Sequence, residues 1–325
     1  MFMKRHLNEQ TKEILTILSD GKFHSGEELG EIIHQSRTSV GRNIRKLQEL
    51  GLEIYSIKGR GFALPYNIEL FDEKRINREC GGADIQVFDM IDSTNRYMMT
   101  YLDTFRPGSC ILAETQTMGV GRGSTRWFSP FGGQLILSMY WNCNRDASIS
   151  GLSLAVGLVT VKTLESFGIR GVGLKWPNDI YAEQKKLAGI LIESKVSLLD
   201  GFQIVIGMGM NLINTQTMQD KHLEAIGLEN ICDNTVSKND LAIALIREYR
   251  KSLEDFNQYG FRKLYSEWNK RDVFQGCKVK LVDKYTNNFL AEGKERGVNE
   301  NGSLIIETSQ GILETFHIGD ISLRK

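Results

Sequence analysis

Residues 113–133 read AETQTMGVGRGSTRWFSPFGG and extend a run of strand-like composition, residues 109–114. Three glycines within five positions of this stretch let the backbone approach a ligand without a Cβ in the way. Arg122 and Arg126 can donate charge-assisted hydrogen bonds to phosphate or carboxylate oxygens. The pattern predicts a strand that opens into a loop closing over an anion. A glycine-rich surface hairpin is the alternative that these residues alone leave open.

The loop is not a standard nucleotide-binding motif. Ser124 breaks the dinucleotide pattern G-x-G-x-x-G, and the chain contains no G-x-x-x-x-G-K-[ST], which excludes a Walker A loop. It also contains no G-x-S-x-G elbow, so a serine hydrolase is not expected.

Length and charge set the broad class of the protein. The 325 residues are enough for two or three domains. Forty acidic residues balance forty basic ones, so contact with nucleic acid must come from local patches of charge. The N-terminus lacks an apolar signal core, and no run approaches the about 18 apolar residues of a membrane span. We therefore expect a cytoplasmic protein without membrane contact.

The cysteines and histidines give no sign of a disulfide framework or a metal site. The five cysteines are odd in number and scattered, and none forms a C-x-x-C pair. The five histidines show none of the spacings that hold zinc. We therefore predict that the protein side chains form no metal site of their own.

Residues 1–66 have the pattern of a winged helix-turn-helix unit. We predict one helix over residues 9–18, a second capped by Ser25 and Glu28, and a third beginning near Ser36. Two strands follow, over residues 53–57 and 62–64, joined by a Lys-Gly-Arg-Gly turn.

Charge within this unit is segregated in the way that DNA binding requires. Residues 9–31 carry six acidic and two basic side chains, whereas residues 37–60 carry six basic and two acidic ones. A recognition helix places polar side chains in the major groove, and a basic wing holds neighbouring phosphates. A unit that only mediates protein contacts is the alternative. The predicted DNA-binding residues are Arg37, Thr38, Ser39, Arg42, Asn43, Lys46, Lys58 and Arg60.

Two further regions follow. In residues 67–270, strands and helices alternate irregularly, which predicts an α+β sheet with helices on one face. From residue 271 onward, five short apolar runs separated by Gly, Asn and Asp predict a small β-barrel. The strand candidates of the larger region are 84–89, 109–114, 134–141, 171–175, 187–194 and 202–212, and its helix candidates are 93–105, 150–167 and 238–258.

Three short polar segments stand at the ends of apolar elements: DSTN at 92–95, KWPND at 175–179 and KLAGI at 186–190. Lys186 opens an apolar strand, where it is either a solvated strand end or a cation aimed into a cleft. A lysine at either of the last two segments would suit a carboxylate or an α-phosphate. Cations, amides and glycine backbone together favour the activation of an anionic small molecule.

Taken together, these motifs resemble the bifunctional biotin-protein ligase and biotin operon repressor family over nearly the whole chain. The match comprises DSTN, GxGR with WFSPFG (119–132), KWPND, KLAGIL (186–191), G-x-G-x-N (207–211) and ISLR (321–324), in the family's order. The resemblance implies a winged helix-turn-helix domain (1–66), a central mixed-sheet, class II synthetase-like ligase domain (67–270) and an SH3-like C-terminal β-barrel (271–325).

The resemblance also implies a role for each matching position. Lys186 and Arg122 would be catalytic. The implied biotin-binding residues are Ser93, Thr94, Asn95, Gln116, Gly119, Val120, Gly121, Arg122, Lys186 and Gly189. The implied ATP- and adenylate-binding residues are Trp127, Lys175, Asn178, Asp179, Asn211 and Arg324.

The family's reaction joins biotin to ATP, accompanied by Mg²⁺, to give biotinyl-5′-AMP, and then transfers biotin to a lysine of the biotin carboxyl carrier domain of acetyl-CoA carboxylase. The adenylate also acts as corepressor, because it promotes a homodimer that binds biotin operator DNA. The resemblance thus implies both activities here. We expect residues 187–194 and those that follow to form the joining edge of the dimer.

Several positions depart from the family loop, G-R-G-R-x-G-R-x-W. Val120, Ser124 and Thr125 replace Arg, Gly and Arg, so two cations are lost while Arg122 remains. Met208 is also bulkier than expected beside a ligand. Two alternatives therefore remain: a repressor that senses the adenylate without catalysis, and a lipoate-type ligase. Retention of Lys186 and Arg122 argues against the first, and WFSPFG and KWPND argue against the second.

Overall fold

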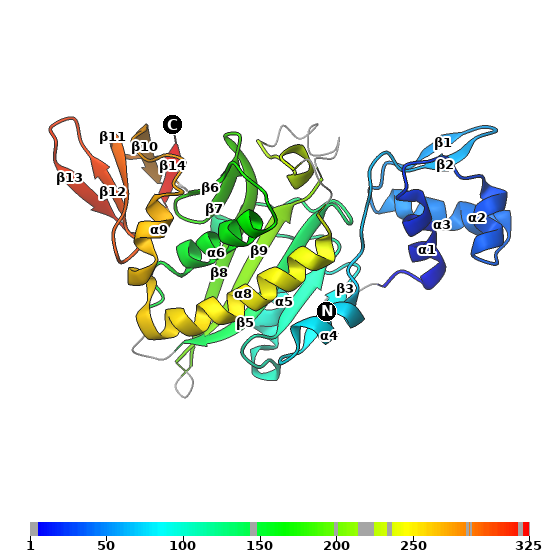
Figure 1. Cartoon of the computed structure of the whole chain (residues 1–325), viewed down its shortest axis with the longest axis horizontal. Helices are drawn as coiled ribbons and strands as arrows, with labels where there is room; N and C mark the ends of the chain where they lie inside the picture. The colour runs from blue at the N-terminus through cyan, green and yellow to red at the C-terminus, as the bar shows by residue number, and fades with distance from the viewer. Residues whose placement is uncertain are drawn as a thin grey trace.

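The computed structural model describes residues 6–143, 148–197, 201–213, 224–232, 236–283, 286, 288–317 and 321–324. Figure 1 shows a small N-terminal unit at one end, a central sheet with helices, and a smaller C-terminal sheet at the other end. Among the described residues, no helix combines the length and apolar composition needed to cross a membrane.

The N-terminal unit has three helices and a hairpin, as predicted. Asn8, Ser25 and Ser36 cap the three helices, and Ser25 forms the predicted capping box with Glu28. The elements are α1 (Glu9–Leu18), α2 (Gly26–Ile32), α3 (Arg37–Glu49), β1 (Tyr55–Ile57) and β2 (Gly61–Ala63).

One predicted DNA contact in this unit is wrong. Asn43 is only 6% exposed, and its side-chain oxygen accepts a hydrogen bond from the Thr11 hydroxyl at 2.9 Å. The position is three residues after Val40 and one before Ile44, both in the core that α3 shares with α1, so its side chain faces α1. Asn43 therefore stabilises the helix packing and is not available to DNA.

The central sheet has seven strands in the order β3-β4-β5-β9-β8-β7-β6. β3 and β4 are parallel and all other neighbours are antiparallel. One of the strands, β7, was not predicted. The strands are β3 (Ile85–Phe88), β4 (Cys110–Ala113), β5 (Gln134–Cys143), β6 (Val172–Lys175), β7 (Asp179–Ala182), β8 (Lys185–Ser197) and β9 (Gly201–Asn211).

Pairing with β7 changes which part of β8 has an open edge. Ala188 and Gly189 pair with β7 on one side and with β9 on the other. The first part of the edge predicted at residues 187–194 is therefore already occupied. From residue 192 to residue 197, β8 pairs only with β9 among the described strands.

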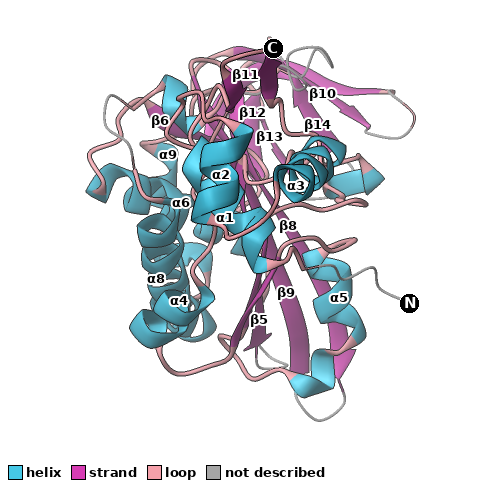
Figure 2. Cartoon of the chain, turned by 90° about the vertical axis from the view of Figure 1, so that its right-hand side faces the viewer, coloured by secondary structure: helices cyan, strands magenta, loops and turns pink. Residues whose placement is uncertain are grey.

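Helices cover both faces of this sheet, so the prediction of one covered face is wrong (Figure 2). Cys110 and Leu112 of β4 belong to the core packed on α6 and α8, whereas Ile111 and Ala113 pack with α5 on the other face. This alternation follows from the two-residue period of a strand. The helices are α4 (Glu73–Cys80), α5 (Thr94–Thr100), α6 (Leu152–Ser166), α8 (Lys238–Tyr259) and α9 (Tyr265–Asn269), with short 3₁₀ turns at Leu102–Thr104, Arg122–Ser124, Leu228–Asn230 and Phe261–Lys263.

A buried ion pair anchors the end of β4, where the glycine-rich stretch of residues 113–133, the glycine loop, begins. The carboxylate of Glu114, 1% exposed, pairs with the ammonium group of Lys238 at the start of α8 and accepts a hydrogen bond from the Phe71 backbone N–H at 2.6 Å. The Glu114 carbonyl accepts from the Gly132 N–H at 3.0 Å. Both ends of the 113–133 stretch are thereby held at one point.

The N-terminal unit is tied to the central sheet at Asp89, directly after β3. This buried carboxylate accepts a hydrogen bond from the Leu7 backbone N–H at 2.7 Å and pairs with the Lys12 ammonium group at 2.8 Å. The linker that follows β2 makes a second connection between the two units, since Ile68 shares a hydrophobic cluster with Leu64 and Phe131.

The C-terminal unit is an open sheet in the order β13-β12-β11-β10-β14. Among the described residues its edge strands β13 and β14 do not pair with each other, so the predicted SH3-like barrel is not confirmed. The domain boundaries at residues 66 and 270 stay predictions. The strands are β10 (Lys278–Asp283), β11 (Phe289–Val298), β12 (Leu304–Glu307), β13 (Leu313–Phe316) and β14 (Ile321–Arg324).

Two acidic side chains are buried together where this sheet meets the central one. Asp272 lies beside β6, since the Leu174 N–H donates to the Arg271 carbonyl at 2.7 Å. Burial and the neighbouring Asp272 carboxyl raise the pKa of Glu295 to about 9, and burial also raises the pKa of Asp272. The two carboxyls therefore share a proton at neutral pH.

We expect Glu295→Gln to stabilise the protein at pH 8. The folded state keeps a proton on Glu295 between its ordinary pKa of about 4.5 and about 9, whereas the unfolded chain does not, so stability falls as pH rises through that window. Gln can make the same hydrogen bonds without a proton to lose. Calorimetry should show an unfolding midpoint raised by about 4 °C at pH 8 and no gain at pH 4.5. An equal change at both pH values would contradict the shared proton.

Candidate functional site

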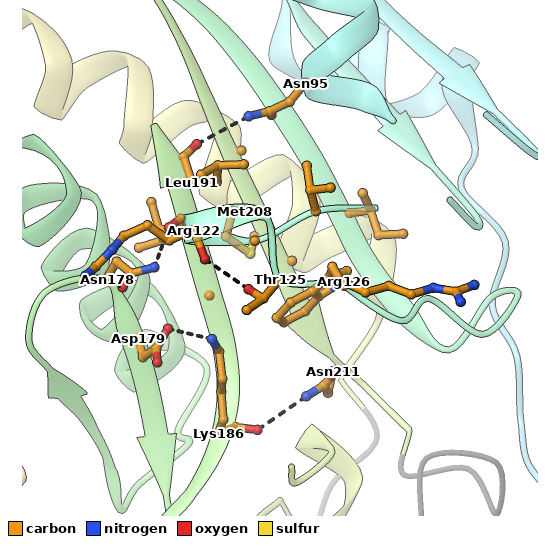
Figure 3. Close-up of a pocket in the computed structure, with 18 of the residues that line it drawn as sticks. Asn95, Arg122, Thr125, Arg126, Asn178, Asp179, Lys186, Leu191, Met208 and Asn211 are labelled. Carbon is orange, nitrogen blue, oxygen red and sulfur yellow. Dashed lines mark hydrogen bonds and ion pairs between the residues drawn. The ribbon is translucent and has the colours of Figure 1, made fainter. Parts of the chain in front are cut away.

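A cavity of about 310 Å³ opens at one end of the central sheet (Figure 3). The glycine loop, the β6–β7 connection, the adjacent parts of β8 and β9, and β14 contribute its walls. Fourteen of the sixteen residues predicted to bind biotin or ATP line it. The exceptions are Gly119 and Arg324.

Two paired glycines form the floor of the cavity beneath Trp127. Gly189 of β8 and Gly209 of β9 are register partners. A Cβ at Gly209 would lie 2.7 Å from the indole, and one at Gly189 would lie 3.3 Å from it. The indole N–H donates to Gln134 Oε1 at 3.0 Å, and Gln134 Nε2 donates to Asn211 Oδ1 at 2.7 Å. The ring is therefore held flat against strand backbone that has no side chains.

Alternation along β9 also explains the bulk of Met208. Its side chain is 2% exposed and packs in the core on the α6 and α8 face, between Gly207 and Gly209 on the other face. The side chain thus packs into the core, while Met208 also contributes to the lining of the cavity.

Two lysines bring positive charge to one end of the cavity. The Lys186 ammonium group lies 2.6 Å from Asp179 Oδ1 and 5.4 Å from the centre of the Trp127 ring. Lys175 donates to the Tyr181 hydroxyl at 3.0 Å. Burial lowers the pKa of Lys175, the nearby acid Asp179 opposes this, and the positive charge of Arg324 adds to it. Arg324 thus acts on the site through Lys175, although it does not line the cavity.

The glycine loop is folded down on the cavity. The Gly121 N–H donates to the Thr125 carbonyl at 2.7 Å, and the Trp127 N–H donates to the Gly119 carbonyl at 2.8 Å. Ser124 has φ +58°, a left-handed conformation that is costly for a residue with a Cβ. This conformation gives a physical reason for glycine at the same place in the family loop.

The two arginines of the loop lie differently. The Arg122 guanidinium donates to Asn178 Oδ1 at 3.4 Å and to the Ile321 carbonyl, so it joins the loop to the β6–β7 connection and to β14. Arg126 is exposed and points away from Lys186 and Asp179 (Figure 3). Both arginines contribute to the lining of the cavity, and Arg122 is the one tied to the connection between Lys175 and Asp179.

The other end of the cavity is polar and nearly uncharged. Ser93 caps α5 by accepting from the Arg96 N–H at 3.3 Å. Gln116 Oε1 accepts from the Thr94 N–H at 2.8 Å and lies 3.1 Å from the Thr94 hydroxyl. Ser138 Oγ lies 2.7 Å from Thr94 Oγ1 and 2.6 Å from Asn95 Oδ1. A small ring with amide-like groups would match this end.

Sequence reasoning missed several residues of this site. They carry no local motif. Gln134 and Glu224 line the cavity, whereas the others act on it through hydrogen bonds to Asn95 or Lys175. The pattern of alternation offered a signal only for Ser138, a hydroxyl inside an otherwise apolar strand. The missed residues are Gln134, Ser138, Tyr181, Glu193 and Glu224.

The predicted DNA-binding surface is largely accessible. Ser39 is half-buried, and the exposed set also includes Arg45, which was not predicted. The β1–β2 hairpin is the wing of this unit. A cation–π contact helps to hold it, since the Arg60 guanidinium lies 4.4 Å from the centre of the Phe23 ring. The predicted residues that are exposed are Arg37, Thr38, Arg42, Lys46, Lys58 and Arg60.

Within the part of the chain that the structure describes, no group of three or more His, Cys, Asp or Glu side chains is placed to hold a metal ion. Asp179 and Glu224 are the two carboxylates among the lining residues of the cavity. A hard cation could therefore be held here only together with oxygens supplied by a ligand.

Comparison with known proteins identifies the family. A model described as the Biotin/lipoate A/B protein ligase family matches residues 87–211, and a model described as HTH domain matches residues 10–63. The Bifunctional ligase/repressor BirA of Salmonella typhimurium is 38% identical over 312 residues, which are 96% of this chain and 96% of that protein. The protein of the same name from Escherichia coli is 38% identical over 314 residues, with the same coverage.

A solved structure supports the same fold. The biotin protein ligase from Aquifex aeolicus, in complex with biotin and ATP, aligns with a TM-score of 0.63 at 24% identity, over 74% of this chain and 99% of that one. With 38% identity to the Salmonella protein along 96% of its length, the chain belongs to the bifunctional ligase/repressor BirA family of biotin/lipoate protein ligases.

Proposed function

We propose that this protein activates biotin with ATP to form biotinyl-5′-AMP and transfers the biotin to a lysine of the biotin carboxyl carrier domain of acetyl-CoA carboxylase. One observation carries the proposal: Lys186, Lys175 and Arg122 converge on a cavity whose far end is polar and nearly uncharged. Relatives named as ligase and repressor at 38% identity support both activities.

The first step brings two anions together. A biotin carboxylate oxygen attacks the α-phosphorus of ATP, a new P–O bond forms, and the bond to pyrophosphate breaks. Lys186 would neutralise the charge between carboxylate and phosphate, after exchanging its ion pair with Asp179 for the substrate. Preorganised cations of this kind supply most of the catalysis in such a step.

The remaining lining residues hold the two substrates. Ser93, Thr94, Asn95 and Gln116 would bind the biotin ring, while Trp127 would stack against adenine, with Asn178 and Asn211 nearby. In the second step, the carrier lysine amine attacks the carbonyl of the adenylate, an amide bond forms, and AMP leaves. A closed glycine loop would exclude water from the adenylate until then.

We further propose that Mg²⁺ enters with ATP. The two cavity carboxylates, Asp179 and Glu224, fit a cation that is held mainly by phosphate oxygens. When bound, the cation screens phosphate charge and orients the leaving pyrophosphate.

We propose that the adenylate-bound protein is also a dimeric repressor of biotin biosynthesis. Two observations support this role: the basic face of α3 and the wing is exposed, and β8 has an open edge at residues 192–197 where a second copy could pair. Val196 on this edge is 63% exposed. Adenylate binding would then favour the dimer by linkage.

We expect Lys186→Ala to lower biotin-dependent exchange of labelled pyrophosphate into ATP by about 100-fold or more, because the transition state loses its central cation. Lys185→Ala, an exposed neighbour on β8, is the matched control and should exchange like the wild type. Lipoate is tested in parallel. Exchange with lipoate alone would favour a lipoate-type ligase, and no exchange with either acid would favour a non-catalytic sensor.

We expect Arg122→Gly to release adenylate and to label bystander lysines, because the loop loses its bonds to Asn178 and Ile321. The measurement is biotin incorporated into serum albumin in the presence of biotin and ATP. Arg126→Gly is the comparison variant, since Arg126 also lines the cavity but its exposed side chain points away from Lys186 and Asp179. Equal labelling by the wild type and Arg122→Gly would refute the role of this arginine.

We expect Arg42→Ala to weaken binding to DNA from upstream of the biotin biosynthesis genes by about tenfold and to reduce the salt dependence by about one charge. Lys22→Ala, exposed outside α3, should bind normally. Sedimentation with biotinyl-5′-AMP should show a doubled mass for all three proteins. Unchanged mass would contradict the dimer, and unchanged affinity of Arg42→Ala would contradict the recognition surface.

A further inference from the structure

The side-chain amide of Asn95 is held on both sides. The residue lies in the first turn of α5 and is 5% exposed. Its Nδ2 donates to Glu193 Oε2 at 2.9 Å and to the Leu191 carbonyl at 3.4 Å, the second of which Figure 3 draws. Its Oδ1 accepts from the Ser138 hydroxyl at 2.6 Å. Both amide protons are thus committed to acceptors on β8.

Glu193 fixes the direction of this hydrogen-bond chain. A carboxylate only accepts, so the Asn95 amide must turn its nitrogen toward Glu193 and its oxygen toward Ser138. The Ser138 hydroxyl donates toward Asn95 Oδ1 at 2.6 Å and toward Thr94 Oγ1 at 2.7 Å. The Thr94 hydroxyl in turn donates to Gln116 Oε1 at 3.1 Å. The protons of Asn95, Ser138 and Thr94 are therefore all directed to acceptors within the protein.

The backbone of β9 prevents the amide from turning away. A Cβ at Gly207 would lie 2.3 Å from Asn95 Oδ1, so the amide packs directly on bare strand. Leu has about the volume of Glu and could fill the space beside Asn95, but it could not set the direction of a hydrogen bond.

The orientation of these hydrogen bonds determines which donors and acceptors the cavity presents to a ligand. Thr94 and Asn95 line the cavity with their protons already donated, to Gln116 and to acceptors on β8, so each presents oxygen lone pairs. Gln116 Oε1 is held by the Thr94 backbone N–H, which leaves its Nε2 as the donor. Two acceptors beside one donor complement a cyclic urea, which has two N–H groups beside a carbonyl oxygen.

We propose that Glu193, which does not itself line the cavity, is a positioning residue that sets the hydrogen-bond polarity of the wall recognising the ureido ring. The proposal rests on the proposed function, since it takes biotin as the ligand. Glu193 thereby makes the site prefer a ligand with N–H donors over a ligand of the same shape that lacks them.

The test uses the full-length protein with Glu193→Leu, Glu193→Gln and the control Lys195→Leu, an exposed position two residues along the same strand. Calorimetry measures binding of biotin and of an analogue in which one ureido N–H is replaced by oxygen. Pyrophosphate exchange gives KM and kcat. Thermal unfolding of each variant verifies folding.

We expect Glu193→Leu to bind biotin about tenfold more weakly and to lose about tenfold of the wild-type preference for biotin over the analogue. KM should rise while kcat at saturating biotin is kept. Glu193→Gln should restore most of the affinity, because its amide oxygen can accept from Asn95. Lys195→Leu should behave like the wild type.

Wild-type affinity and preference in Glu193→Leu would overturn the proposal, as would an equal loss in Lys195→Leu. Failure of Glu193→Gln to restore affinity would also overturn it, because the polarity would then not be the cause. Biotin binding by the wild type without exchange would contradict the ligase function alone. No binding of biotin by the wild type would overturn both.

Discussion

The pairing register of β8 and β9 is the constraint on which the site depends. With Gly189 opposite Gly209, the indole of Trp127 lies on bare backbone and Gly207 leaves room for Asn95. A slip of one residue would turn every side chain of a strand to the other face, so Met208 would stand where the indole or the amide now lies. Both ends of the cavity thus share one alignment, and the long ladder between these two strands maintains it.

A second constraint keeps the loop above this floor. The buried pair between Glu114 and Lys238 joins the end of β4 to the start of α8, and Glu114 also holds the linker at Phe71. A buried charge left alone is strongly destabilising, so neither partner can be lost singly. The glycine loop can therefore rearrange around a ligand while its two ends stay in place.

The sequence predicted the elements whose signals are local. Caps and apolar spacing located α1, α2 and α3, and fourteen of the sixteen residues predicted from the motifs to bind biotin or ATP line the cavity. The failures were non-local. Asn43 has a polar side chain, and only the packing of α1 against α3 shows that it is buried. β7 begins at the last residue of the KWPND motif and is short, so only its pairing with β6 and β8 defines it. Glu193 is nearly a hundred positions from Asn95, and no spacing rule connects them.

The ties at Asp89 and at Ile68 fix the N-terminal unit to the central sheet at two separate points, and two points prevent the swivelling that a single linker would allow. In the proposed dimer joined by the β8 edges, the distance and angle between the two α3 helices would consequently be set by the protein. Such a dimer would accept only half-sites of one spacing on DNA. Half-sites one base pair too far apart would rotate by about a tenth of a turn out of phase, and either the duplex or these two ties would have to be distorted.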